Sequence, residues 1–492
     1  MKIKSAILIL IILVLAIEPA VILASDGKSY IYDGYIYDYW GDALESPAAF
    51  QLECVIDENS FGGMKVQGIN DVCTSKDGRI FLVDTLESRI HVMNEDGEMI
   101  KSIKVIRDEN NKIVLDPITG SQLVLTQPQG VFVHEKQHEL YIADTGANRV
   151  IVLNSDTYVH KRTIEKPENM SGVSEFKPSK IAVDTSDRIY IVVQSSYEGI
   201  IELNEDGTFS RYFGVNSPTV NLIDYFWKSI ASDEQKEKMK KNFAPAFNNV
   251  ALDGEGFIFA VTYDSASQDS VFRLNSQGKN VLREMGNTFV VGDIWSMGSK
   301  KENSQFVDVA VTDYGTYAVI DRLKGRIFLY NFDGELLNVF GSIGKLKGEF
   351  QIPSAISWLN DKLVVSDSTL KCAYILAPTQ FGEAILRANE YYYYGKWDEA
   401  LGWFEKAVEL NANYEIGYTG IGKNYLMKDD YKKAMYYFKL GNAKTYYSQA
   451  YNGRRAEVLK ENFWIVAVLF VILIGVIVGS EIRYFKKKGG NT

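Results

Sequence analysis

The side chains that most often carry out chemistry are few in this sequence. Its 492 residues include four histidines and three cysteines. His134 and His138 are four residues apart, a spacing that suits two metal ligands on one helix face, but they flank a predicted hairpin turn, where that geometry does not arise. No Gly-x-Ser-x-Gly elbow, phosphate-binding loop or paired zinc-ligand spacing occurs. We therefore expect no catalytic residue, no metal ligand and no cofactor.

One pattern of strands and turns recurs six times in the central part of the chain. Each copy has a short apolar strand, a tight turn, a second apolar strand, a loop, and a third strand that usually ends in Asn. Asp-Gly pairs such as Asp77-Gly78 favour two-residue hairpin turns, because Gly readily adopts positive φ. The pattern predicts a mainly β fold, a six-bladed β-propeller over residues 48–378. The copies begin at Gly68, Gln129, Ser179, Asn248, Val307 and Ser354.

The two ends of this region are expected to meet. The sixth copy lacks a fourth strand, because Ala377-Pro378 follows its third. The segment Ala48–Ile56 precedes the first copy and can supply the missing strand, which closes the ring. Cys54 then lies on the closing strand and Cys372 on its neighbour, so a disulfide between them is one expectation. Cys73 competes for this pairing, and three cysteines allow one pair at most.

The copies resemble NHL repeats. The second copy matches best: residues 141–146 read YIADTG and residues 148–150 read NRV. The resemblance covers about residues 50–378 and implies a propeller in which the repeat Asp and Arg tie neighbouring loops together. In the third and fourth copies Gln194 and Thr262 replace the Asp, so only their apolar frame fits. The matching positions are Asp84, Arg89, Asp144, Asn148, Arg149, Asp321, Arg326 and Asp367.

Long connections between copies indicate which face of the propeller binds a partner. In a meander ring these connections share one face with the loops between second and third strands, and binding residues concentrate on such loops. The helical insertion at residues 220–243 has an apolar stripe that includes Leu222, Phe226 and Trp227, and Arg322 lies on the same face. We expect a partner to bind there. The alternative is a lid that packs onto the propeller rim.

Residues 383–461 change to a helical period. Ala388, Tyr391 and Phe404 recur 34 residues later as Gly422, Tyr425 and Phe438. A 34-residue period with small residues at helix crossings resembles tetratricopeptide repeats. Such repeats imply protein or peptide binding. A stalk that spaces the propeller from a membrane is the alternative.

Both ends of the chain carry targeting signals. Residues 1–24 are typical of a secretory signal peptide, cleaved or retained as an anchor. The Tyr-rich segment at residues 25–47 is interpreted as a strand on the propeller edge; its alternative is stacking on sugar rings. Residues 463–482 are predicted to span a membrane, because Phe463–Ser480 is an uncharged apolar run of sufficient length, and residues 483–492 form a basic tail. Because positive flanks stay cytoplasmic, we expect a single-pass protein of the cell membrane with its N-terminal domain extracellular and its C-terminus cytoplasmic.

The charge distribution narrows the partner classes. The whole chain carries −10, its first 24 residues +1 and its last 12 residues +3, so the part between them carries −14. This acidity disfavours nucleic acid as a partner. We predict a membrane-anchored extracellular binding or scaffold protein that recognises a protein or a carbohydrate. Proteins of this architecture look like accessory components beside membrane transport systems.

An enzyme is the alternative function. Sugar-lactone hydrolases and amidating lyases also have six-bladed propellers, so a metal-dependent lactonase or lyase is also compatible with the fold. The metal ligands of those enzymes are spread along the chain, and no matching set can be placed in this sequence. We therefore expect binding rather than catalysis.

Overall fold

The structure of the protein is a computed structural model. It describes residues 31–116, 119–170, 175–194, 199–214, 246–262, 269–282, 292–293 and 304–489. The predicted signal peptide at residues 1–24 and the helical insertion at residues 220–243 lie outside the described residues.

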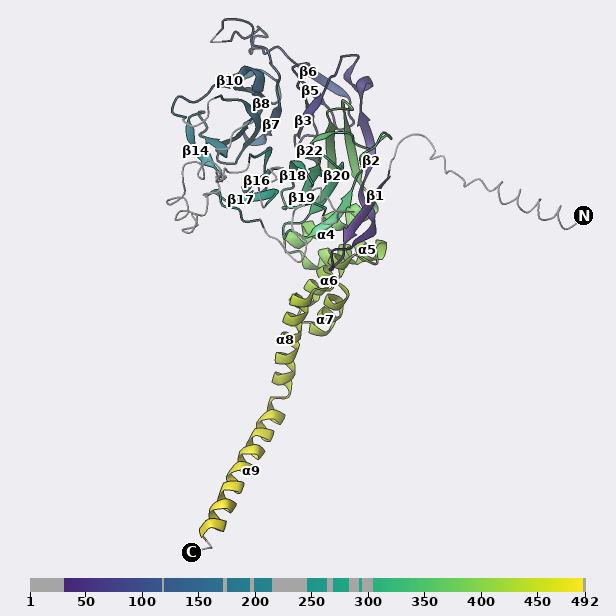
Figure 1. Cartoon of the computed structure of the whole chain (residues 1–492), viewed down its shortest axis with the longest axis vertical. Coiled ribbons are helices and arrows are strands. Elements are labelled where there is room, and N and C mark those ends of the chain that lie inside the picture. The colour runs from purple at the N-terminus through teal and green to yellow at the C-terminus, as the bar shows by residue number, and fades with distance from the viewer. Residues whose placement is uncertain are drawn as a thin grey trace, which may run out of the picture.

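Four of the repeat copies form separate antiparallel sheets whose strands follow one another in the sequence (Figure 1). The first contains β3 (Ile69–Thr74), β4 (Ile80–Asp84), β5 (Arg89–Met93) and β6 (Met99–Ile103), and the second β7 (Gly130–His134), β8 (Glu139–Asp144), β9 (Arg149–Asn154) and β10 (His160–Ile164). The third contains β11 (Pro178–Val183), β12 (Ile189–Val193), β13 (Ile200–Leu203) and β14 (Phe209–Phe213). The described strands of the fourth are β15 (Asn249–Leu252), β16 (Ile258–Val261) and β17 (Val271–Leu274).

The fifth and sixth copies share one nine-stranded sheet. Its order is β18 (Phe306–Val311), β19 (Tyr317–Asp321), β20 (Arg326–Tyr330), β21 (Leu336–Phe340), β1 (Ile31–Tyr37), β2 (Ala43–Ile56), β24 (Cys372–Pro378), β23 (Lys362–Asp367) and β22 (Pro353–Leu359). The prediction of six separate blades is therefore wrong, since four copies form separate sheets. The physical reason is β1, which pairs with β2 on one side and with β21 on the other and so joins two copies.

The sheets are arranged around a closed ring. The first strands of the copies contact one another in the cyclic order β3, β7, β11, β15, β18, β22 and back to β3. The prediction that residues 48–56 close the ring is confirmed, because β2 pairs with β24 from Phe50 opposite Pro378 to Ile56 opposite Ala373. The protein thus has a mainly β, propeller-like fold.

The predicted Cys54–Cys372 disulfide does not form. A register shift between Leu52 and Cys54 places Cys54 opposite Ile375, three residues from Cys372. Cys54, Cys73 and Cys372 are all free thiols.

The strands bury both of their faces. Along β4, Phe81 and Val83 pack in one hydrophobic cluster, whereas Ile80 and Leu82 pack in the next. All four are fully buried. Each such side chain contributes about 1.5–3 kcal/mol by leaving water, so stacking of sheet on sheet accounts for the apolar character of both strand faces.

Short helical turns and a helical module complete the described chain. The 3-10 turns are η1 (Glu58–Phe61), η2 (Glu135–Gln137) and η3 (Thr145–Ala147), and the helices after the last strand are α4 (Gln380–Tyr393), α5 (Trp397–Leu410), α6 (Glu415–Met427), α7 (Tyr431–Leu440) and α8 (Lys444–Glu461). Thr379 begins α4, since its hydroxyl accepts a hydrogen bond from the Gly382 N–H (3.1 Å). Consecutive helices pack against each other, and a Cβ on Gly422 would lie 2.6 Å from the Phe438 ring, so a small residue is required at this crossing.

The helical module is docked on one end of the propeller (Figure 1). The Tyr393 hydroxyl donates to Glu255 in the turn between β15 and β16 (2.9 Å), and the Asn331 amide in the turn after β20 donates to Asn389 of α4 (3.2 Å). The Phe332 ring stacks on Tyr392. These turns join first to second and third to fourth strands, so the module covers the face opposite the long connections.

A last helix, α9 (Phe463–Gly489), follows α8 directly and extends away from the propeller (Figure 1). Among the described residues it is the one helix long and apolar enough, by length and composition, to cross a membrane, and none of its apolar window is buried.

Candidate functional site

The predicted partner-binding residues are only partly visible. Leu222, Phe226 and Trp227 lie outside the described residues. Arg322 lies in the turn between β19 and β20, on the face opposite the helical module. Its side chain is exposed, and its backbone N–H donates to the Gln305 carbonyl (2.9 Å). Arg322 is therefore accessible to a partner on that face.

The repeat residues of the second copy hold a loop in place. Asp144 is fully buried at the end of β8 and accepts a hydrogen bond from the Thr126 N–H (2.5 Å). Arg149 forms ion pairs with Asp144 (2.9 Å) and with Asp116. Burial raises the pKa of Asp144 to about 6, against the opposing effect of the Thr126 N–H and Arg149. Asn148 sits in the left-handed region with φ of 59°, which a short polar side chain tolerates.

The matching aspartates of other copies also accept backbone N–H groups from loops. Asp84 accepts from Gln67 (3.0 Å), and Asp367 accepts from Gln351 (2.7 Å). Asp321 accepts from Gln305 (3.1 Å) in the same way. These carboxylates thus tie each preceding connection to its sheet, which is a structural function.

The arginines of the first and fifth copies have other partners. Arg89 lies opposite Asp84 in the ladder, but its guanidinium donates to the Met64 sulfur at 3.7 Å. Arg326 pairs with Asp293. Within the described copies, the Asp–Arg pair that the NHL resemblance implies is seen in the second.

Asp293 is the centre of a cluster that holds the N-terminal strand. Its side chain is 2% exposed and pairs with Lys324 (2.9 Å) and with Arg326. The hydroxyls of Tyr35 and Tyr37 on β1 both donate to it. Despite burial, these partners lower the pKa of Asp293. Two of the N-terminal tyrosines therefore bind β1 to the fifth copy.

A charged cluster on the ring of first strands was not predicted from the sequence. Lys180 of β11 forms an ion pair with Asp71 of β3, and both side chains are largely buried. The second Asp71 oxygen accepts from the Val131 N–H (2.9 Å), and Asp308 of β18 accepts from the Ile356 N–H (2.8 Å). Burial raises the pKa of Asp308 to about 7, against the effect of Lys180. The sequence did carry a signal for this cluster: the first strands of the first, third and fifth copies have a charged residue at the same position, namely Asp71, Lys180 and Asp308.

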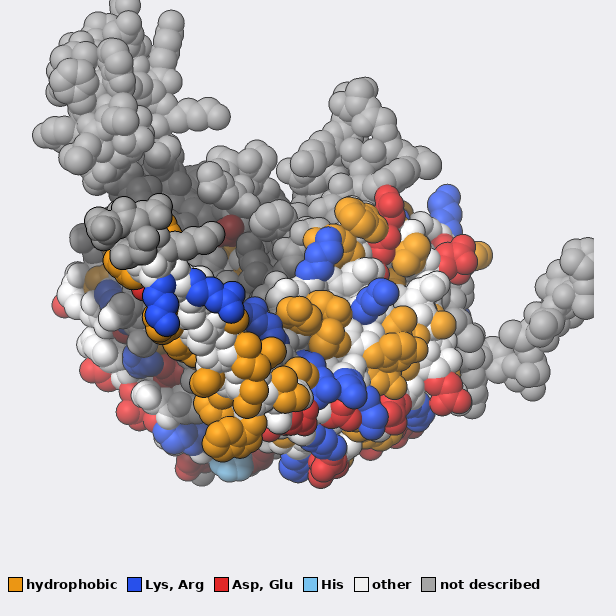
Figure 2. Space-filling view, turned by 90° about the horizontal axis from the view of Figure 1, so that it is seen from below, with side chains coloured by type: hydrophobic (Ala, Val, Ile, Leu, Met, Phe, Trp, Pro, Cys, Tyr) orange, Lys and Arg blue, Asp and Glu red, His pale blue; other side chains and the backbone are white. Residues whose placement is uncertain are grey.

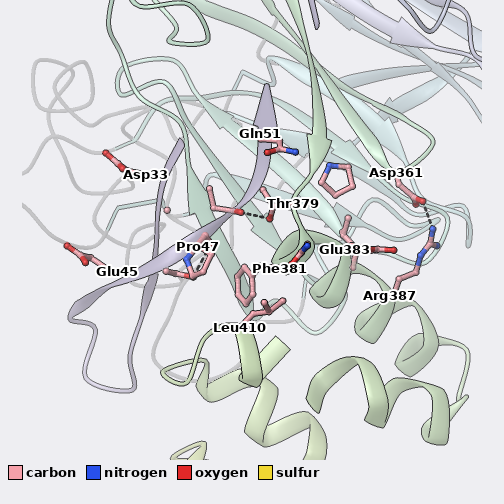
Figure 3. Close-up of a pocket in the computed structure, with 16 residues that line it drawn as sticks. Asp33, Glu45, Pro47, Gln51, Asp361, Thr379, Phe381, Glu383, Arg387 and Leu410 are labelled. Atoms are coloured by element: carbon pink, nitrogen blue, oxygen red, sulfur yellow. Dashed lines mark hydrogen bonds and ion pairs between the residues drawn. The ribbon is translucent and has the colours of Figure 1, made fainter. Parts of the chain in front are cut away.

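A cavity among the described residues lies between the N-terminal hairpin and α4 (Figure 3). Its volume is about 980 Å³, within the range of ligand-binding clefts. Phe381 and Leu386, each 2% exposed, form an apolar floor. Asp33 and Glu45 lie on the hairpin side. We call this cavity the junction cleft.

The far side of the junction cleft is partly neutralised. Arg387 of α4 forms an ion pair with Asp361 and another with Glu390 (2.6 Å). Figure 3 shows the Asp361–Arg387 pair at one edge and Glu383 beside it. The cleft thus combines an apolar floor with an acidic rim.

Within the parts of the chain that the structure describes, no group of three or more His, Cys, Asp or Glu side chains is arranged to hold a metal ion.

Comparisons with known proteins give structural likenesses. No family model and no curated protein matches this sequence. Similar solved structures include a streptogramin B lyase (13% identity, 64% of this chain and 95% of that chain, TM-score 0.40). Others are an inactive virginiamycin B lyase from Staphylococcus aureus (11%, 72% and 96%, 0.38) and the Swd1 β-propeller domain of Myceliophteria thermophila (10%, 64% and 98%, 0.37). At these values the likeness concerns the fold alone.

Proposed function

We propose that this chain is a membrane-anchored binding protein built on an NHL-type propeller with six repeat copies. The face of the propeller that carries the long connections between copies and Arg322, which we call the open face, binds a protein partner outside the cell. The observation that carries the proposal is the docking of the helical module. The module occupies the face of the short turns and leads directly into α9, so the long connections and Arg322 point away from the helix that would enter the membrane.

Aromatic residues at both ends of α9 support a membrane span. Phe463 and Trp464 begin the helix, and Tyr484 and Phe485 lie near its end. At a rise of about 1.5 Å per residue, the two pairs are about 30 Å apart, which equals the thickness of a hydrocarbon core. Trp and Tyr concentrate at the two membrane–water interfaces.

The surface on the side of α9 carries both apolar and charged side chains. Viewed from below, Figure 2 shows patches of hydrophobic side chains with Lys and Arg side chains between them and Asp and Glu side chains beside them. Basic residues also lie on both sides of the apolar part of α9, with Arg454, Arg455 and Lys460 before the helix and Arg483 and Lys486 in its last turns. Since both flanks are basic, our proposed orientation rests on the signal-like N-terminus, which would direct the large preceding domain outward.

The module is interpreted as tetratricopeptide-like and as rigidly mounted. The Lys423 ammonium lies 3.8 Å from both Asp333 and Glu335 of the propeller, and its side chain is 8% exposed. The Asn411 amide donates to the Ser46 hydroxyl (2.9 Å). These buried contacts favour a fixed angle between propeller and helices over a flexible stalk.

Protease accessibility in intact cells tests the orientation. Added protease should degrade the propeller of the full chain, and deletion of residues 463–482 should release the protein into the medium. Protection of the propeller in intact cells would contradict the proposal.

Crosslinking tests the open face as the partner site. We expect replacement of residues 220–243 by a Gly-Ser linker, combined with Arg322→Glu, to abolish partner capture while the propeller stays folded. Unchanged capture of the same partner by this variant would exclude the open face. A transport complex is the first membrane assembly to look for among the captured proteins.

A further inference from the structure

The junction cleft lies where one more strand of the nine-stranded sheet would be. β2 pairs with β24 only from Phe50 to Ile56, because β24 ends at Pro378 and the chain turns away into α4. The preceding part of β2, Ala43–Pro47, pairs with β1 on one side and, among the described strands, with none on the other.

Backbone groups mark the ends of this open edge. The Thr379 N–H donates to the Ala49 carbonyl (2.9 Å), and its hydroxyl donates to the Ala48 carbonyl (2.7 Å), so Thr379 replaces a paired strand at that point. Pro47 has no N–H to donate, which is typical of edge strands. Residues Ala43–Ser46 remain as an edge that an extended chain can pair with.

The rim of the cleft is negative. Asp33, Glu45 and Glu383 have exposed carboxylates and form no ion pair with the described residues, whereas Asp361 is neutralised by Arg387. The five charges sum to −3 when the carboxylates are ionised. Within a concave site this charge attracts cations.

The apolar floor of the junction cleft suits a ligand that carries apolar side chains as well as positive charges. Phe381 and Leu386 form its buried base, and Leu410 adds a side chain that is 37% exposed. Successive side chains of a strand point to opposite faces, so an added strand can direct apolar side chains to this floor and basic ones to the rim.

We propose that the junction cleft binds an extended, lysine- or arginine-rich segment of a partner protein, which adds to the sheet as a short strand along Ala43–Ser46. The inference deepens the proposed binding function and assigns a second contact on the face nearer α9. The occupant alternates basic and apolar residues.

Fluorescence anisotropy with labelled peptides tests this assignment on the full chain in neutral detergent. The probe is the heptapeptide KVKVKVK, and the matched probe EVEVEVE reverses its charge. We expect the basic probe to bind and the acidic one not to. The triple variant Asp33→Lys, Glu45→Lys and Glu383→Lys should weaken binding at least about tenfold, equivalent to about 1.4 kcal/mol.

A matched variant controls for net charge. Glu109, Glu168 and Glu205 are exposed and lie outside the cleft, so their replacement by Lys changes the total charge equally. This control should bind the basic probe as the wild type does. Equal loss of binding in both triple variants would show a general charge effect and overturn the cleft assignment.

Two further measurements separate strand addition from other modes. Methylation of alternate backbone nitrogens of the probe should abolish binding, because it removes the N–H groups that pair with the edge; equal affinity of the methylated probe would overturn strand addition. Sedimentation of the probe-free chain should show no self-association. Self-association that the cleft reversal abolishes would identify a second copy as the occupant instead.

Failure of the cleft and failure of the proposed function remain distinguishable. If the basic probe does not bind, the cleft assignment is wrong, but partner capture through the open face is scored independently with the variant that lacks residues 220–243.

Discussion

Replacement of Lys180 by methionine should destabilise the propeller strongly. Lys180 carries the cation that pairs with Asp71 on the ring of first strands, and the two side chains are 13% and 6% exposed. Methionine keeps a similar length but leaves the Asp71 carboxylate buried without its countercharge. Removing one member of a buried pair typically costs about 3–5 kcal/mol, so we expect a loss of this size in the free energy of unfolding.

The double variant Asp71→Asn/Lys180→Met isolates the cause. It removes both charges, and buried pairs replaced by neutral groups of similar volume often leave stability nearly unchanged. We expect it to be more stable than Lys180→Met alone. Lys136→Met provides the control, since Lys136 pairs with Asp187 at the surface and such pairs contribute about 0–1 kcal/mol.

The pH dependence of Lys180→Met gives a second test. Burial raises the pKa of Asp308 to about 7, whereas Lys180 opposes this shift. Without Lys180 the pKa values of Asp71 and Asp308 should rise further. A folded-state pKa above the ordinary value means that the folded protein binds extra protons, so acidification stabilises it. The difference in the free energy of unfolding between the wild type and Lys180→Met should therefore become smaller as the pH falls from about 8 to about 5.

Urea unfolding followed by tryptophan fluorescence, at several pH values, measures all of these effects in neutral detergent. A Lys180→Met protein within about 1 kcal/mol of the wild type would refute the reasoning. So would a double variant that loses the sum of the two single losses, because that result would mean that the two charges do not interact.

Three further outcomes are expected. Burial lowers the pKa of His91 to about 4, so the free energy of unfolding should fall by about 3 kcal/mol as the pH drops from about 6.5 to about 4. In urea titrations at several pH values, His91→Phe should remove this pH dependence. Gly382→Ala places a methyl group against the Ala49 carbonyl and should undock α4, seen as faster proteolysis near that helix, whereas Gly402→Ala in open space should not. Asp293→Asn removes a carboxylate bound by two tyrosines and two basic side chains, so amide hydrogens of β1 should exchange faster; unchanged exchange would contradict its role.

Local signals in the sequence predicted the strands well. Gly78, Gly97 and Gly207 have φ between 80° and 90°, as predicted, and the closing strand pairs with β24 as expected from the missing fourth strand. The predicted turn length of two residues is wrong at Gly78, because the Ser75 N–H donates to the Arg79 carbonyl and three residues lie between this pair. These features depend on neighbouring residues or on the count of strands. Both are visible in a linear sequence.

The joined sheet could not be predicted in the same way. β1 carries tyrosines that fit a strand, and the expectation of a strand on the propeller edge agrees with its pairing to β21. Its consequence, the fusion of two copies, depends on Gly34 opposite Phe340, a contact between residues about three hundred positions apart. No repeat pattern encodes that pairing.

The buried charges illustrate the same limit. Asp71 and Lys180 are 109 positions apart and meet only because the ring closes. Their polar character within apolar strands was visible, but their partners depend on which first strands face each other. The disulfide prediction failed for a related reason, since the register of two strands far apart in the sequence places Cys54 opposite Ile375, three residues from Cys372.

The N-terminal hairpin connects the two binding proposals physically. Its tip reaches the helical module, where the Tyr39 N–H donates to Glu415 (3.0 Å) and the Lys444 ammonium lies 4.4 Å from the Tyr39 ring centroid. One arm of the hairpin completes the propeller sheet, and the other is held by Asp293. A segment bound in the junction cleft would therefore contact β2 and α4 together. Such a ligand would stabilise the contacts between the propeller and the helical module, which keep the open face directed away from α9. We therefore expect binding at one site to favour binding at the other rather than to compete with it.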